Sequence, residues 1–283
     1  MQLFEKVCPP VNRRRSRIDQ VATWYTWSST VREILTSWTN YLPNVPRPRL
    51  VRLSRGAPYS WTFSLPIYLV RKRRLRDQLL ALASALYAFD PGDELMLLCG
   101  LLDRDFSANA LHHLFAYLRT LMVNISNDEM AATYAPLGEV GWDVGAFPLH
   151  CDLFLSEILF TVFDQAALDH SGASLFLSVS QLRELMERDL QLQPDIVTEI
   201  THTITARLEN DGFDQLFRLL YCRSWTRRLT SAMKAQQFRV KLETGQGYII
   251  NDRRWLHGRE APSEGVPTRR LRRLSFHTSR ESL

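Results

Sequence analysis

Pro148-Leu149-His150-Cys151-Asp152 is the stretch that decides how this chain is interpreted, together with the distant Trp255-Leu256-His257-Gly258-Arg259. His150 and Asp152 stand two positions apart, and residues i and i+2 of a β-strand face the same side of a sheet. An imidazole from a distant strand, that of His257, completes two histidines and one carboxylate around a metal ion. Such a set leaves coordination positions open and suits non-heme Fe(II). The spacing therefore makes His150 and Asp152 candidate ligands, with a chance pair as the alternative, and His257 a candidate for the third ligand.

The composition is that of an ordinary folded protein. The 283 residues are 45% hydrophobic and 23% charged, so we expect one domain over residues 1–283. Its N-terminal portion, residues 1–93, is expected to be mostly helical, and residues 180–236 to form a helical insertion. The four cysteines are scattered and form no CxxC pair, so we expect neither a disulfide framework nor a zinc ribbon. Such cysteines fit the reducing cytoplasm best, and a cytoplasmic location is expected. No membrane segment is expected, because no run of about 18 apolar residues occurs.

Basic residues raise the question of a nucleic-acid partner. The net charge is +5, and the excess lies in runs that include residues 13–17, 71–76 and 269–273. Such runs are more often solvated faces than binding sites. We therefore expect no nucleic acid as the main partner.

Hydrophobic periodicity predicts a mixed α and β chain. Helices are expected over residues 18–41, 70–88, 108–121, 181–189, 195–210 and 213–235. Strands are expected over residues 94–102, 146–152, 157–163, 174–179, 238–243, 248–251 and 271–277. Thr244-Gly245-Gln246-Gly247 has hairpin residues and is expected to join two of these strands directly.

The stretch Asn251-Asp252-Arg253-Arg254-Trp255-Leu256-His257-Gly258-Arg259, with the earlier His-x-Asp and the later arginines, resembles a known family. It is similar to the Fe(II)/2-oxoglutarate-dependent dioxygenases of the taurine dioxygenase and clavaminate synthase branch. The family more often has the acid before the amide, whereas here Asn251 precedes Asp252. The resemblance implies a distorted double-stranded β-helix (jelly roll) core with flanking and inserted helices. It also implies Fe(II), 2-oxoglutarate as co-substrate, and O2.

The same resemblance implies an arginine that binds the far carboxylate of 2-oxoglutarate. Arg269 and Arg273 have the spacing of the family's Arg-x-Leu-x-Arg pattern, and the planar guanidinium matches a carboxylate as lysine does not. Ser174 is the candidate hydroxyl beside them, although Ser171-Gly172-Ala173-Ser174 reads equally well as a plain turn. Because arginines crowd residues 269–273, a one-residue slip would select Arg270 instead.

The implied function is that of an oxidoreductase, a 2-oxoglutarate-dependent dioxygenase. It would hydroxylate or otherwise oxidise an unactivated C–H bond of a small polar metabolite, amino acid or natural-product intermediate. No catalytic residue is expected beyond the metal ligands. Asn251 and Arg259 are expected to hold the segment of the distal histidine, and Trp142 and Phe147 are read as pocket lining or as core. Two alternatives remain: a non-catalytic jelly-roll binding module, and an oxygenase that acts on nucleic acid.

Overall fold

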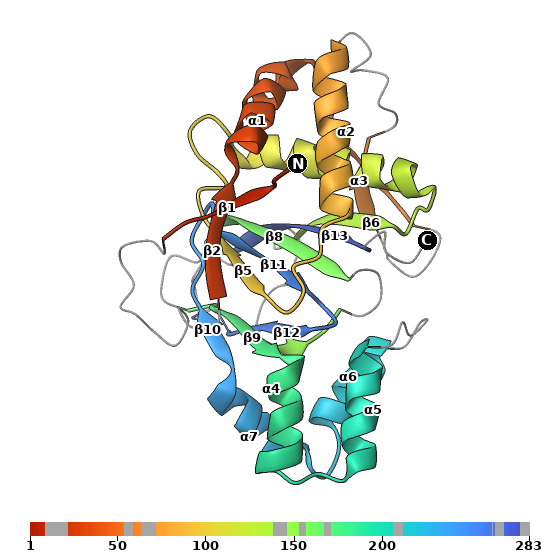
Figure 1. The fold of residues 1–283 in the computed structure, drawn as a ribbon, viewed down its shortest axis with the longest axis vertical. Helices are drawn as coiled ribbons and strands as arrows, with labels where there is room; N and C mark the ends of the chain where they lie inside the picture. Colours follow the sequence, from red (N-terminus) through yellow and green to blue (C-terminus); the bar gives the residue numbers. More distant parts are fainter. Residues whose placement is uncertain are drawn as a thin grey trace.

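The computed structural model describes residues 1–8, 22–53, 59–63, 72–137, 146–152, 157–166, 171–205, 212–261, 263 and 269–277. In these ranges two β-sheets lie one above the other, and helices cover the outer face of each (Figure 1). The chain is therefore a mixed α and β protein built in four layers.

The larger sheet has seven strands in the order β1-β2-β5-β11-β8-β13-β6. Neighbours pair antiparallel, except that β2 and β5 run parallel. In sheet order the bounds are Phe4–Lys6 (β1), Ala22–Trp27 (β2), Leu95–Leu98 (β5), Gly247–Asn251 (β11), Ile158–Gln165 (β8), Arg270–Phe276 (β13) and Ala132–Leu137 (β6).

The smaller sheet has four antiparallel strands in the order β10-β9-β12-β7. In that order the bounds are Phe238–Val240, Ser174–Ser178, Trp255–Arg259 and Phe147–His150. A separate pair is formed by β3 (Arg49–Val51) and β4 (Ser60–Thr62).

Two groups of helices cover the sheets. The helices on the larger sheet are α1 (Ser29–Tyr41), α2 (Arg73–Tyr87) and α3 (Ala108–Ser126), with a 3-10 turn at Leu42–Asn44. Those on the smaller sheet are α4 (Val179–Glu184), α5 (Pro194–Thr205), α6 (Gly212–Tyr221) and α7 (Thr226–Gln236), with a π turn at Leu185–Asp189. Among the described residues, no helix has the length and apolar character needed to cross a membrane.

Alternation along the strands assigns side chains to layers, since successive strand residues face opposite sides. On β8, Leu159 and Phe163 fill the space between the sheets, whereas Phe160 packs beneath α1–α3. On β12, Trp255 faces inward and Leu256 packs against α4–α7. The space between the sheets therefore has an apolar core of its own. A polar side chain at an inward position is an exception in this core and indicates a possible functional site.

Most of the predicted elements are confirmed, and α3 begins where expected, with Ser107 as its N-cap. Residues 18–41 were expected to be one helix, but their described part is strand β2 followed by α1. The alternating β-branched and aromatic residues of β2 explain the difference, because they favour a strand. The described residues of the N-terminal portion thus contain strands as well as helices. The single helix expected over residues 213–235 is two helices, α6 and α7.

The predicted hairpin at 244–247 is wrong. β10 pairs with β9 in the smaller sheet, whereas β11 pairs with β5 and β8 in the larger one, so this segment crosses between the sheets. Gly245 has φ +79°, and a Cβ at Gly247 would collide with the backbone carbonyl of Thr161 on β8. Gly245 thus allows the backbone turn of the crossover, and Gly247 allows β11 to approach β8 closely.

A buried ion pair fixes which arginines of β13 face outward. Asp164 on β8 has a side chain that is 0% exposed, and its Oδ2 lies 2.7 Å from a terminal nitrogen of Arg272. Arg270 lies farther away, with Nε 3.9 Å from Oδ1. Because Arg270 and Arg272 face this acid, Arg269 and Arg273 must face the space between the sheets. The structure thus turns Arg269 and Arg273 inward and Arg270 outward, and which arginine binds a co-substrate stays a prediction.

Replacing Asp164 by asparagine should lower the free energy of unfolding by about 3 kcal/mol. The change keeps the shape of the side chain but leaves Arg272 buried without its counter-charge, and breaking a buried pair costs about 3–5 kcal/mol. Urea denaturation measures the difference. Asp77→Asn is the control, because it breaks the exposed 3.0 Å pair with Arg76 and should cost less than about 1 kcal/mol. Equal costs would contradict this role for Asp164.

Candidate metal centre

The three predicted ligands converge between the two sheets. β7 and β12 run antiparallel with His150 and His257 as direct partners, and their ring centroids are 4.3 Å apart. Nε2 of His150 lies 3.2 Å from Oδ1 of Asp152, and Nε2 of His257 lies 3.7 Å from its Oδ2. One detail differs from the expectation: β7 ends at His150, so Asp152 follows the strand rather than lying on it.

The donor atoms suit a single first-row metal ion. One atom from each residue lies within 4.8 Å of the others. Two ligands on opposite sides of one ion can be about 4.4 Å apart at most, if each bond is about 2.0–2.2 Å. A shift of the three side chains by a few tenths of an ångström would therefore bring all three donor atoms within bonding distance of one ion. Nε2 of His257 is buried without a hydrogen-bond partner among the described residues, which is the condition of a lone pair kept for a metal.

The protonation states also suit a metal. Burial lowers the pKa of His257 to about 4, and burial with the neighbouring His257 lowers the pKa of His150. Burial opposes ionisation of Asp152, but the Arg273 guanidinium together with the imidazoles of His257 and His150 outweighs burial and holds the pKa of the carboxyl well below its usual range. At neutral pH the site thus offers two neutral imidazoles and one carboxylate, the forms that bind metals.

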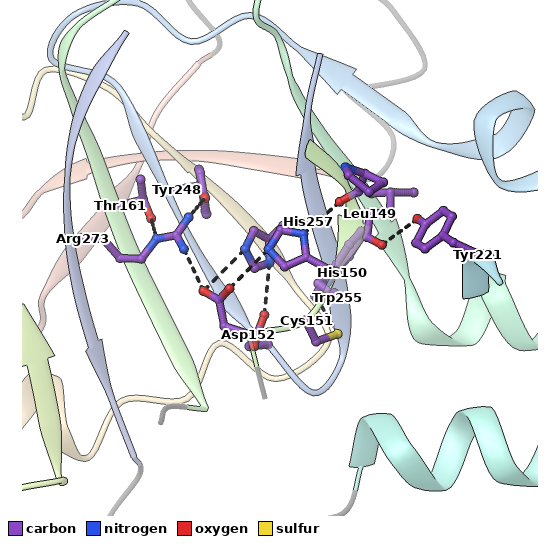
Figure 2. A network of polar contacts seen from close by, with 12 residues as sticks. Leu149, His150, Cys151, Asp152, Thr161, Tyr221, Tyr248, Trp255, His257 and Arg273 are labelled. Atoms are coloured by element: carbon purple, nitrogen blue, oxygen red, sulfur yellow. Dashed lines mark hydrogen bonds and ion pairs between the residues drawn. The ribbon is translucent and has the colours of Figure 1, made fainter. Parts of the chain in front are cut away.

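Backbone contacts orient His150. Its Nδ1 lies 2.8 Å from the carbonyl oxygen of Pro148, so Nδ1–H donates there and Nε2 is left for the metal. The Tyr221 hydroxyl on α6 donates to the carbonyl oxygen of Leu149 at 2.7 Å (Figure 2). The ring of Phe147 packs edge-on against the imidazole, with centroids 4.4 Å apart. The helices beneath the smaller sheet thereby help hold the strand that carries this ligand.

Arg273 binds the metal-site carboxylate directly. One terminal nitrogen donates to Oδ2 of Asp152 at 2.7 Å and the other donates to the Tyr248 hydroxyl at 3.1 Å. Its Nε donates to Oγ1 of Thr161 at 3.3 Å, so strands β8, β11 and β13 all contribute (Figure 2). The side chain is 16% exposed. Arg273 therefore holds Oδ2 of Asp152 in place, while Oδ1 of Asp152 faces His150.

Arg269 and Ser174 meet farther along the same inner space. One terminal nitrogen of Arg269 donates to Oγ of Ser174 and to the carbonyl oxygen of Gly172, both at 3.1 Å. The guanidinium carbon lies 5.0 Å from the ring centroid of Phe163. The two residues expected to share a co-substrate are thus neighbours, with the cation held over an aromatic face.

Gly258 allows the two histidine-bearing strands to approach each other. A Cβ there would come within 2.9 Å of the carbonyl oxygen of Phe147 and 3.0 Å of the amide nitrogen of Leu149. Any side chain would push β7 away from β12. The glycine that follows His257 is therefore required by the close pairing that places His257 beside His150.

Some residues around the candidate site were missed from the sequence. Thr161 and Tyr248 carry no motif, although their alternation with buried apolar neighbours puts them on the inward face. Asp252 was noted only for its order after Asn251, yet its side chain is 0% exposed and lies beside His257. Asn251 itself contacts the turn, where its Oδ1 accepts from the amide of Arg253 at 3.0 Å.

Arg259 is buried at the end of β12, while Trp142 lies outside the described residues.

A polar hollow of about 790 Å³ lies beside the β11–β12 turn and is lined by none of the three candidate ligands. Its charged walls are already paired, for example Arg254 with Asp93 at 2.7 Å. We therefore assign it no part in the metal chemistry.

Replacing His257 by glutamine should weaken the binding of Co(II), an air-stable substitute for Fe(II), by at least about 100-fold. The change removes one of three protein ligands, and the loss of even an outer partner typically costs about 10- to 100-fold. Isothermal titration calorimetry measures the affinity. His202→Gln is the control, because His202 is an exposed histidine on α5 and should leave the affinity unchanged. Equal Co(II) affinity in the two variants would disprove the site.

Comparisons with known proteins give a weak likeness in structure. No family model matches the chain, and no curated protein matches it in sequence. An asparagine oxygenase in complex with Fe(II), 2S,3S-3-hydroxyasparagine and succinate aligns at 12% identity, covering 89% of this chain and 92% of its own, with a TM-score of 0.45.

The non-heme iron oxygenase OrfP in complex with Fe and alpha-ketoglutaric acid aligns at 12% identity, covering 91% and 94% of the two chains, with a TM-score of 0.46. At TM-scores below 0.5 these likenesses establish neither fold nor activity. The chemistry of the site has to be inferred from its own residues.

Proposed function

We propose that this chain is an Fe(II)- and 2-oxoglutarate-dependent oxygenase that oxidises an unactivated C–H bond of a small polar metabolite, amino acid or natural-product intermediate. The observation that carries this is the convergence of His150, Asp152 and His257 on one point, since two histidines and a carboxylate on one side of an ion suit such enzymes. We also infer that the two facing sheets form a distorted jelly roll, whose interior would hold the site.

Arg269 and Ser174 would bind the far carboxylate of 2-oxoglutarate. The β9–β12 register pairs Phe176 with His257 and Ser174 with Arg259, so Ser174 lies two residues along from the level of the metal ligand. At about 3.4 Å per residue this offset is roughly 7 Å. A five-carbon diacid held by the metal at one end would reach the guanidinium at the other.

The remaining residues would position the reactants. Iron and 2-oxoglutarate, when bound, supply the oxidising chemistry with O2, and the chain holds them in place. Arg273 places a second cation on the same inner face, where it would hold Asp152 in position beside the bound ion. The apolar residues between the sheets exclude water from this space. No residue beyond the metal ligands is proposed as catalytic.

A small molecule is the proposed substrate class, rather than nucleic acid. Of the basic run 269–273, Arg269 and Arg273 face inward, and Arg272 is paired with the buried Asp164. These side chains cannot contact phosphates on a surface. Submicromolar binding of DNA or RNA at physiological salt, with release of succinate stimulated by it, would favour the nucleic-acid alternative.

The direct test is an anaerobic titration of the Fe(II)-loaded protein with 2-oxoglutarate. Chelation of the ion by the 2-oxo acid should produce a visible charge-transfer absorption band. Exposure to O2 with candidate amino acids should then release succinate. Absence of the band would disprove the proposed co-substrate, and a band without succinate for any substrate would favour the binding-module alternative.

The two neighbouring arginines provide a matched pair of variants. Arg269→Ala should raise the 2-oxoglutarate concentration for half-saturation of the band roughly 10- to 100-fold, because a charge-assisted contact to a carboxylate contributes about 1.5–3 kcal/mol. Arg270→Ala should change it little, since Arg270 faces outward toward Asp164. Equal shifts in the two variants would contradict the assignment of Arg269.

A further inference from the structure

A buried acid lies directly behind the distal histidine. Asp252 is in the turn between β11 and β12, with a side chain that is 0% exposed, and its Oδ1 lies 3.1 Å from Nδ1 of His257. Its amide donates to the carbonyl oxygen of Glu157 at 2.7 Å, which ties the turn to the start of β8. The other ring nitrogen, Nε2, faces Asp152. Asp252 thus contacts the side of the imidazole that points away from the metal site.

We propose that Asp252 is a positioning residue of the metal centre, whose carboxylate accepts the Nδ1 proton of His257 and so directs the Nε2 lone pair at the ion. The inference rests on the proposed metal site but not on the identity of the co-substrate. A carboxylate at this position fixes the tautomer and the ring orientation, and it raises the basicity of the ligand.

The two histidine ligands differ in this respect. Nδ1 of His150 contacts a neutral acceptor, the carbonyl oxygen of Pro148, at 2.8 Å. Nδ1 of His257 faces an acid instead, at hydrogen-bonding distance although not in full alignment. A hydrogen bond to an ionised acceptor is roughly twice as strong as one between neutral groups. With the proposed hydrogen bond formed, His257 would be the stronger electron donor of the pair.

Burial supports a functional role over a purely structural one. Burying an acid costs free energy unless it is paired. Asp252 is buried five residues before His257, and its Oδ1 lies 3.1 Å from Nδ1 of that imidazole, which makes the imidazole one partner of the acid. Since the turn is short, Asp252 cannot shift without moving His257. The acid and the imidazole therefore act as one unit.

Asp252→Asn keeps the size of the side chain and replaces the charged acceptor by a neutral one. We expect Co(II) affinity to fall about 10- to 100-fold, as measured by calorimetry, with no loss in the melting temperature of the metal-free protein. Asp93→Asn is the matched control: Asp93 is 85% exposed and pairs with Arg254 in the same turn. Wild-type affinity in Asp252→Asn, or an equal loss in Asp93→Asn, would overturn the proposal.

A second measurement tests the wild-type protein first. In ¹⁵N–¹H correlation spectra of the Zn(II)-loaded wild-type protein, the proton of His257 should reside on Nδ1 and resonate far downfield. In a folded Asp252→Asn variant the resonance should move upfield, because the neutral acceptor makes a weaker bond; a purely structural acid would not move it. A proton on Nε2 would overturn the proposal. Failure of the wild-type protein to bind Co(II) would instead remove the metal centre itself.

Discussion

The antiparallel register of β7 and β12 is the constraint on which the candidate metal centre depends. It makes His150 and His257 direct partners, so that their imidazoles lie side by side. A slip of one residue would turn the distal histidine toward α4–α7 and bring an apolar neighbour inward. Gly258 permits this register, because any side chain at position 258 would collide with the backbone of β7. The geometry of the ligands is therefore set by main-chain pairing rather than by the side chains themselves.

Each of the three ligands has an outer partner of a different kind. A main-chain carbonyl orients His150, a guanidinium binds Asp152, and an acid faces His257. These partners come from a strand, from the opposite sheet and from a turn. The centre is consequently held by both sheets at once, and movement of either sheet would be transmitted to the ligands. Rigid placement of this kind is what positioning a reactive ion requires.

The sequence predicted that His150 and His257 share one face and that Arg269 and Arg273 turn inward, because both depend on alternation, which is a local property of a strand. It failed where partners are chosen at a distance. Residues 244–247 have hairpin chemistry, yet β10 and β11 join different sheets, since pairing with β9 and β8 buries their apolar faces. Asp252 was overlooked for the same reason: nothing in a turn sequence indicates which side chain it will meet. The roles of Arg269, Arg273 and Ser174 remain predictions.

The helices α4–α7 lie between the strands that carry the first and last ligands, and this arrangement fixes the order of events in a newly made chain. His150 and Asp152 leave the ribosome long before His257, separated by about a hundred residues. At roughly 5–20 residues per second, that interval is about 5–20 s. Throughout it, β7 lacks its partner strand and the candidate centre lacks its second imidazole. Loading of the proposed metal would therefore have to follow synthesis of the C-terminal strands, so a chain truncated before β12 would have no complete centre to load.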